Sequence, residues 1–385
     1  MKRMTSGFLI ILLICVTVFP CFAADRQTPA LEISAQSAVL MDAASGDVLF
    51  QKNAHQKLYP ASVTKIMSLL LFMEAVEGKK LKLKESVTAT AEAVSKGGSQ
   101  IWLKEGESMT VDELLRATAI GSANDACTAL AVHLAGSEAA FVKQMNNRAK
   151  ALGMKDTLFE NCTGLDDDTN NHMTTAYDVA LMSRALLTHE KIQKYSTVWM
   201  DSLRNGKTQL VNTNKLVRFY NGTTGLKTGT TNKAGCCISA SAARDGLHLI
   251  AVVMHAQSSA DRFSDAKALL DWGFASFESV TPTMDSKALH PVAVRRGIVE
   301  TVDIEKPQLQ KLLLKMGEKA QLKTSIELAP DVYAPVEQGQ QLGSLTISLG
   351  EKTLAKYPLC AASPVCAQTL FDVMLRLLQA LRVRN

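Results

Sequence analysis

Residues 60–67 read PASVTKIM and open a long helical pattern that ends at Gly78. Ser62 and Lys65 stand three positions apart, so on a helix their side chains share one face. A serine hydroxyl becomes a good nucleophile when a neighbouring base takes its proton, and a lysine can be that base when burial lowers its pKa. Because residues 66–76 are nearly all apolar, the pattern predicts a buried helix with a reactive Ser62 at its exposed end.

The Ser-x-x-Lys spacing alone is a weak signal, because it recurs at Ser264 and Lys267. Ser264 lies within a polar segment, and we assign it a surface role. Further motifs are therefore needed to support a nucleophile at Ser62.

A second polar cluster falls between two helical segments, where residues 120–126 read IGSANDA. Ser122 and Asn124 form the only Ser-x-Asn of the sequence. A loop there can present a hydroxyl to a proton relay and an amide to a peptide or to Lys65. The alternative is a helix cap, since Asn124 and Asp125 both suit an N-cap position.

The only Lys-Thr-Gly occurs at Lys227, Thr228 and Gly229, and it leads into a predicted strand. An ammonium group and a hydroxyl there can bind a substrate carboxylate, while the glycine lets an extended peptide backbone approach closely. The alternative is a simple turn, because residues 223–225 have a similar composition.

The segments around these motifs indicate an α+β fold. Apolar runs flank a turn within 37–51, and β-like runs at 236–243 and 247–255 flank a turn ending in glycine, so both regions predict hairpins. Helical spacing occurs at 111–120, 126–135, 139–152, 176–187 and 264–277. This order predicts one sheet built from both ends of the segment, with a helical layer packed against it.

The sequence after about residue 280 predicts a second domain and a tail. From 286 to 359, short apolar runs alternate with Gly, Pro and Asp, which is typical of a small β-rich domain. Residues 365–385 predict an amphipathic helix, because six apolar side chains fall within a sector of about 120°: Leu370, Phe371, Met374, Leu377, Leu378 and Leu381. With Arg382 and Arg384 at its end, this helix is predicted to lie in the interface of an anionic membrane. The alternative is a terminal helix docked on its own protein.

The amino terminus has the features of a secretory signal. Lys2 and Arg3 precede an apolar run over 8–19 and small residues near Ala23, so we expect a signal peptide over 1–23. The apolar run is too short to span a membrane comfortably, and the alternative is an uncleaved anchor. Export permits disulfides, yet the cysteines outside the signal show no framework, and we expect free buried thiols.

Length and charge set further bounds. A chain of 385 residues suggests two domains. Its net charge of +5 is mild and no dense Lys/Arg stripe is present, so nucleic acid is not an expected partner. No CxxC or HExxH pattern occurs, and we predict no metal site.

Together the three motifs resemble the set of the penicillin-binding proteins and serine β-lactamases. Ser122 follows Ser62 by 60 residues, and Lys227 follows Ser122 by 105. The chain specifically resembles the D-alanyl-D-alanine carboxypeptidases of low molecular mass. The stretches GLKTGTT (225–231), NCTGL (161–165) and HMTTAYD (172–178) carry the same likeness, which covers about 31–280 closely. The β-rich region and the tail match the family's layout by pattern.

The resemblance implies a penicillin-binding transpeptidase fold over 30–280 and a two-step mechanism. Ser62 would attack the carbonyl of the penultimate D-alanine of a peptidoglycan stem peptide ending in D-Ala-D-Ala, the terminal D-alanine would leave, and water would hydrolyse the ester. Lys65 would be the base, with Ser122 and Lys227 in the proton network. β-Lactams would acylate Ser62 as substrate mimics, and no cofactor is implied.

The resemblance also implies the residues that bind substrate: Asn124, Lys227, Thr228, Gly229, Thr230 and Arg262. The backbone N–H groups of Ser62 and Thr230 would form the oxyanion hole. Arg262 would assist the terminal carboxylate, and the alternative for it is a surface arginine. The enzyme would mature the cell wall from the outer face of the bacterial cytoplasmic membrane.

Three other functions are compatible with some of these features. A class A β-lactamase uses a glutamate loop to activate the deacylating water, but residues 160–164 read ENCTG and do not fit it. A DD-endopeptidase would use the same residues and stays open. A catalytically silent wall-binding protein is the third alternative, and the intact Ser62, Lys65 and Lys227 argue against it.

Overall fold

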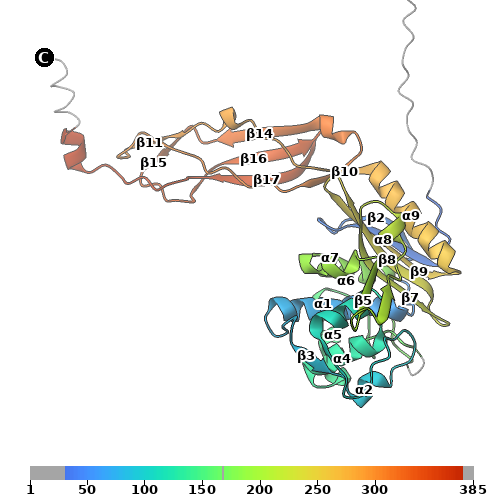
Figure 1. The fold of residues 1–385 in the computed structure, drawn as a ribbon. Helices are drawn as coiled ribbons and strands as arrows, with labels where there is room; N and C mark the ends of the chain where they lie inside the picture. Colours follow the sequence, from blue (N-terminus) through green and yellow to red (C-terminus); the bar gives the residue numbers. More distant parts are fainter. Residues whose placement is uncertain (1–30, 167–168, 376–385) are drawn as a thin grey trace, which may run out of the picture.

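One antiparallel sheet gathers strands from both ends of the first domain (Figure 1). Its order is β2-β1-β9-β8-β7, with β1 (Ser37–Asp42), β2 (Val48–Lys52), β7 (Thr223–Thr231), β8 (Gly235–Arg244) and β9 (Leu247–Ala256). The computed structural model describes residues 31–166 and 169–375. The two predicted hairpins and the predicted shared sheet are confirmed.

Alternating side chains along these strands fill two separate cores. Val39 packs into the core of the helical layer, and its neighbour Leu40 packs into the core under α9 (Ser259–Ser276) on the opposite face. Cys237 and Cys236 divide between the same two cores, because adjacent residues of a strand point to opposite faces. The sheet is therefore covered on both faces.

The chain between the two hairpins is mainly helical. Helix α6 packs against α1 and against strands β1 and β9, which places the helical layer directly on the sheet. The helices of this layer are α1 (Lys65–Glu77), α2 (Ala91–Val94), α3 (Val111–Ala119), α4 (Asn124–Ala135), α5 (Glu138–Ala151), α6 (Ala176–Leu187), α7 (Gln193–Ser196) and α8 (Leu216–Phe219). Those with a predicted start begin within two residues of it. The exception is α1, which is preceded by the 3₁₀ turn η1 (Ala61–Thr64). Two small ribbons flank this layer: β3 (Ser86–Thr88) with β4 (Ser108–Thr110), and β5 (Met200–Leu203) with β6 (Thr208–Val211).

Helix α9 begins five residues earlier than the predicted start at Ser264. The hydroxyl of Ser258 accepts a hydrogen bond from Asp261 N, so Ser258 is the N-cap. Inside the helix, the Asp265 carboxylate accepts two hydrogen bonds from Ser34 and one from Ala35 N. Ser264 is exposed on this helix, on the far face of the sheet from α1, which confirms its assignment to the surface.

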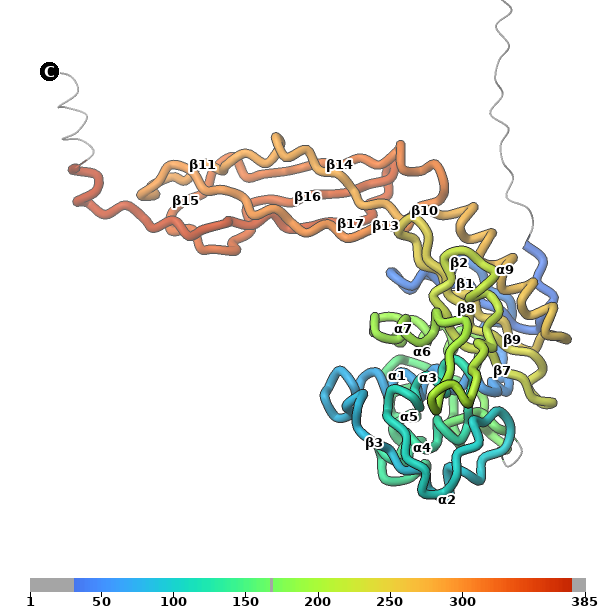
Figure 2. The backbone as a smooth tube through the Cα atoms, viewed as in Figure 1, coloured from blue at the N-terminus to red at the C-terminus, as the bar shows by residue number. Residues whose placement is uncertain are grey.

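Residues after α9 form an elongated β-rich arm that extends away from the first domain (Figures 1 and 2). Strand β10 (Phe277–Val280) pairs with β13 (Leu312–Lys315) and so connects α9 directly to the arm. The remaining strands are β11 (Val292–Arg295), β12 (Thr301–Val302), β14 (Leu322–Leu328), β15 (Asp331–Tyr333), β16 (Gln341–Leu349) and β17 (Lys352–Cys360). The predicted β-rich character of this region is confirmed.

The far end of the arm holds the start of the tail. Val365 and Ala367 form isolated bridges with Val336 and Gly297, and helical residues begin only at Leu370. The helix thus starts five residues later than expected, because 365–367 pair with the arm. The last part of the predicted helix, from residue 376, and the predicted signal lie outside the described residues. Within the described ranges, no helix is both long enough and apolar enough to span a membrane.

The cysteines of the described chain are all free. Cys127, Cys162, Cys236 and Cys237 are buried, as predicted. The prediction of burial is wrong for Cys366, which is exposed, and for Cys360, which is half-buried, because the narrow arm encloses only a small core.

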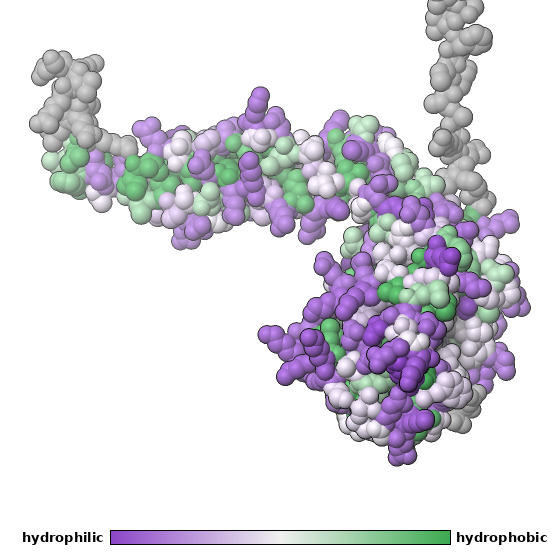
Figure 3. Space-filling view, viewed as in Figure 1, coloured by the Kyte–Doolittle hydropathy of each residue, from purple (hydrophilic) through white to green (hydrophobic). Residues whose placement is uncertain are grey.

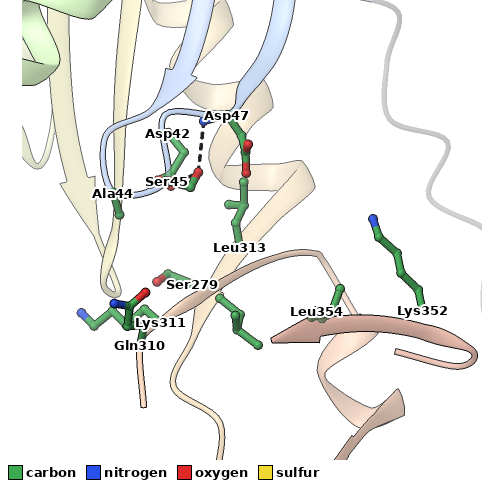
Figure 4. Close-up of a pocket in the computed structure, with 11 residues that line it drawn as sticks. Asp42, Ala44, Ser45, Asp47, Ser279, Gln310, Lys311, Leu313, Lys352 and Leu354 are labelled. Atoms are coloured by element: carbon green, nitrogen blue, oxygen red, sulfur yellow. Dashed lines mark hydrogen bonds between the residues drawn. The ribbon is translucent and has the colours of Figure 1, made fainter. Parts of the chain in front are cut away.

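A cavity of about 580 Å³ lies where the arm meets the first domain (Figure 4). Asp42 at the end of β1 and Ser45 of the following turn line it on one side, and Lys311 and Leu313 of the arm line it on the other. This cavity borders the β2-β1 edge of the sheet, whereas the sequence motifs lie beside β7 at the other edge. Figure 3 shows mostly polar side chains on the visible face of the first domain and more apolar ones along the arm.

Candidate active site

The predicted nucleophile lies in a tight turn ahead of α1. Ala61 has a φ of +47°, and the following 3₁₀ turn brings residues three apart onto one side. Lys65 is the first residue of α1, and its Nζ lies 2.9 Å from Ser62 Oγ. The predicted pairing of these two side chains is therefore present in the structure.

Lys65 is fully buried and holds its ammonium group among three oxygen acceptors. Besides Ser62 Oγ, it donates to Asn124 Oδ1 at 2.5 Å and to Thr163 O at 2.9 Å. Burial lowers the pKa of Lys65 to about 8, because removal from water penalises the charged form. A lysine in this environment can exchange a proton with the serine hydroxyl near neutral pH.

The Ser-x-Asn stretch adjoins the same lysine. Asn124 is the first residue of α4 and is buried, and its Nδ2 also donates to Gly97 O at 2.7 Å. The cap interpretation is wrong, since Ala123 occupies the N-cap position and Asn124 uses its amide to join Lys65 to the loop at Gly97. Ser122 is buried with a φ of +61°, a strained conformation for this residue type.

The Lys-Thr-Gly stretch lies within β7 rather than in a turn. This strand is at the edge of the five-stranded sheet, and a Cβ at Gly229 would stand 2.8 Å from both Pro60 O and Ser62 N. Only a glycine lets the strand run this close to the nucleophile turn. The unpaired edge of β7 beside Ser62 offers backbone groups to an extended peptide.

Lys227 is buried in the same strand, and its surroundings lower its pKa. Its Nζ donates to Thr228 O at 3.0 Å and lies 3.5 Å from Thr213 Oγ1. Burial, followed by the positive charges of Lys65 and Arg262, holds the pKa of Lys227 well below its usual value. A ligand carboxylate would relieve this positive field, so the site favours an anion.

Arg262 is a buried residue of α9 and not a surface arginine. Its Nη1 donates to Gly229 O at 3.0 Å and to Thr230 Oγ1 at 2.8 Å. These bonds fix the end of β7 from behind, whereas Thr230 itself is exposed. The guanidinium group therefore braces the strand that carries the Lys-Thr-Gly motif.

Sequence reasoning gave no role to several residues that complete the site. Thr163 contributes only its carbonyl, and Gly164, with a φ of +86°, packs so closely that a Cβ would meet Ala61 O. His172 accepts a hydrogen bond from Glu160 N at Nδ1, so its Nε2–H donates to Thr64 Oγ1 at 2.9 Å. Burial lowers the pKa of His172 to about 4, which keeps the ring neutral.

The arrangement brings together a nucleophile, a buried amine and an edge strand. Ser62, Lys65 and Asn124 are joined by direct hydrogen bonds, and Gly229 touches the nucleophile turn. Lys227 is linked more indirectly, through Thr213, whose N–H bonds Ile120 O just ahead of the Ser-x-Asn loop. Within the described ranges, no group of three His, Cys, Asp or Glu side chains is placed to hold a metal ion.

Comparison with known proteins identifies the family to which the chain is similar. Residues 23–258 match the family model of the D-alanyl-D-alanine carboxypeptidases, and residues 277–366 match that of the penicillin-binding protein 5 C-terminal domain. The chain is 39% identical over 367 residues to the D-alanyl-D-alanine carboxypeptidase DacF of Bacillus subtilis, which covers 94% of each protein.

Solved structures agree with the sequence comparison. Penicillin-binding protein 5 of Haemophilus influenzae superimposes with a TM-score of 0.73 at 30% identity, over 87% of this chain and 98% of that one. Penicillin-binding protein D2 of Listeria monocytogenes, solved with ampicillin bound, gives a TM-score of 0.59 at 32% identity, over 64% of this chain and 100% of that one. The chain therefore belongs to the D-alanyl-D-alanine carboxypeptidase family of low-molecular-mass penicillin-binding proteins, and it is a serine-type D-Ala-D-Ala carboxypeptidase.

Proposed function

We propose that Ser62 is the residue acylated in this reaction and that Lys65 is its base. Ser62 Oγ attacks the carbonyl of the penultimate D-alanine while Lys65 Nζ takes the hydroxyl proton, and the terminal D-alanine leaves as a free amino acid. Water then hydrolyses the ester and restores the serine. The observation that carries the proposal is the 2.9 Å contact between Ser62 Oγ and a fully buried amine.

The substrate binds along the free edge of β7 in this proposal. Lys227 and Thr228 hold the terminal carboxylate, and the lowered pKa of the buried Lys227 supports this assignment, because a bound carboxylate would stabilise its charged form. The N–H groups of Ser62 and Thr230 stabilise the oxyanion, because Gly229 brings these two backbones together.

Three polar side chains support the reaction without being acylated. Ser122 relays the proton from Lys65 to the leaving amine, and Asn124 holds Lys65 and the substrate amide. Arg262 acts as a positioning residue, since its hydrogen bonds go to Gly229 and Thr230.

Release of free D-alanine from a peptide ending in D-Ala-D-Ala tests the proposal. Ser62→Ala should abolish release and labelling by a fluorescent penicillin. Ser264→Ala is a matched control, because Ser264 begins the second Ser-x-x-Lys and is exposed on α9, and it should keep both. Labelling that persists in Ser62→Ala would show that another residue is acylated.

The family acts on peptidoglycan, and its chemistry lies outside the cytoplasm. We propose further that residues 1–23 direct export and that 365–385 bind the outer face of the cytoplasmic membrane. The exposed apolar side chains at the start of the tail helix support this location: Leu370, Phe371, Val373 and Met374.

A truncation tests the membrane assignment. The cut belongs after Gln368, because Val365 is buried in the arm and Gln368 Nε2 donates to Gly297 O. The shortened protein should leave the membrane fraction and keep full turnover. Retention of the shortened protein on membranes would contradict the assignment of the tail.

A further inference from the structure

A large exposed aromatic side chain stands in a fixed position close to the active site. Trp102 is 75% exposed, yet its backbone has a φ of +58°, which is unfavourable for a bulky residue. Its neighbours Ile101 and Leu103 are both buried. The loop therefore holds Trp102 in a strained backbone conformation that projects the indole ring into solvent, and this points to a binding role.

The backbone on both sides of Trp102 is held by a buried carboxylate. Asp125, which follows Asn124, accepts hydrogen bonds from Ile101 N at 3.2 Å and from Leu103 N at 3.0 Å. Arg204 Nη1 donates to Ile101 O at 2.8 Å from the other side. The position of the ring is thus set by the element that carries Asn124.

A groove of about 630 Å³ opens beside this ring. Its lining includes Trp102, Lys104 and Glu107 from one loop and Arg204 and Lys207 from the tip of the β5–β6 hairpin. Arg204 pairs with Glu107 at 2.7 Å. Lys104 and Lys207 form no ion pair within the described chain, so the groove carries a net positive charge that suits a carboxylate.

The groove lies within reach of a peptide bound at Ser62. Asn124 N donates to Ser99 O at 2.6 Å, and the three residues from Ser99 to Trp102 span at most about 11 Å. An extended peptide covers the same distance in about three residues. The residues of a stem peptide that precede D-Ala-D-Ala can therefore extend from Asn124 to Trp102.

We propose that this groove is a subsite for the acidic middle part of the stem peptide. The indole face of Trp102 packs against the aliphatic part of that segment. Lys104 and Lys207 pair with its free carboxylate, such as the α-carboxylate of a γ-linked D-glutamyl residue. The inference rests on the proposed acylation of Ser62 and adds a determinant of substrate choice remote from the reacting atoms.

Three synthetic substrates test the subsite with the full-length protein. The first is a pentapeptide with γ-D-glutamate, the second is its γ-D-isoglutamine amide, and the third is an acetylated tripeptide ending in D-Ala-D-Ala. Trp102→Ala should lower kcat/KM about tenfold for both pentapeptides and leave the tripeptide unchanged. Lys104→Gln and Lys207→Gln should each cost about threefold for the glutamate peptide only.

Matched variants separate binding from folding. Phe219→Ala removes another exposed aromatic ring outside the groove and should change none of the three rates, while Trp102→Phe should recover most of the loss. An equal loss on the tripeptide would assign Trp102 a structural role and overturn the proposal, as would unchanged pentapeptide rates. Failure of the proposed function would instead appear as wild-type protein that neither releases D-alanine from the tripeptide nor labels at Ser62.

Discussion

Gly229→Ala should disable the site by steric means alone. The new Cβ would stand 2.8 Å from Pro60 O and Ser62 N and 2.9 Å from Ala61 Cβ. Packed atoms do not tolerate such contacts, so β7 and the nucleophile turn must separate by about 0.6 Å. A shift of 1 Å in a reacting group costs about 10²-fold, and we expect kcat/KM to fall about 10- to 100-fold. Overpacking of this kind also lowers the free energy of unfolding by about 1–3 kcal/mol.

The assay is D-alanine release together with the rate of acylation by a fluorescent penicillin. Both rates should fall in parallel, because both ligands need the same distance between β7 and Ser62. Ser264→Ala is the control, since Ser264 is exposed on α9, and it should retain wild-type rates. Wild-type acylation by Gly229→Ala would refute the close packing on which the proposed oxyanion hole depends.

Three further predictions concern charge and hydrogen bonding. The neutral amine of Lys65 is the proposed base, so acylation should rise nearly tenfold per unit of pH up to pH 7 and level off above its pKa of about 8; a rate that is constant from pH 6 to 8 would contradict this role. His172 is neutral when folded, with its pKa lowered to about 4, so stability is complete above about pH 6.5 and is lost as pH falls towards 4. Urea unfolding should show the wild type losing up to about 3 kcal/mol more than His172→Gln over that interval, and equal losses would exclude the effect. Asn124→Leu leaves Lys65 Nζ and Gly97 O without their partner and should cost about 1–3 kcal/mol of stability, measured by thermal unfolding, and most of the acylation rate.

Side-chain motifs made much of the site predictable from the sequence. The side chains of Ser62 and Lys65 are in contact as predicted, because a spacing of three residues places them on one side of either a 3₁₀ turn or an α-helix. The Lys-Thr-Gly stretch was expected to lead into a strand, and the structure places Lys227 within β7 itself. The sheet followed from two hairpin patterns, whose apolar runs reflect strands buried on both faces.

Contacts made through the backbone could not be predicted in this way. Thr163 and Gly97 act through carbonyl groups, which every residue has, so their identities carry no signal. The role of Asn124 was ambiguous, because an amide suits a helix cap as well as a lysine partner. The late start of the tail helix depends on pairing of Val365 with Val336, a long-range contact that local periodicity does not encode.

The open edge of β7 has a consequence for the behaviour of the protein in a crowded envelope. An unpaired strand edge is ordinarily an aggregation hazard, because any other extended chain can add to it. Here the turn at Pro60 and Ser62 packs against Gly229, and we expect this turn to limit the length of any strand that adds to β7. The turn that carries the proposed nucleophile would thereby also protect the open edge of the sheet from polymerisation.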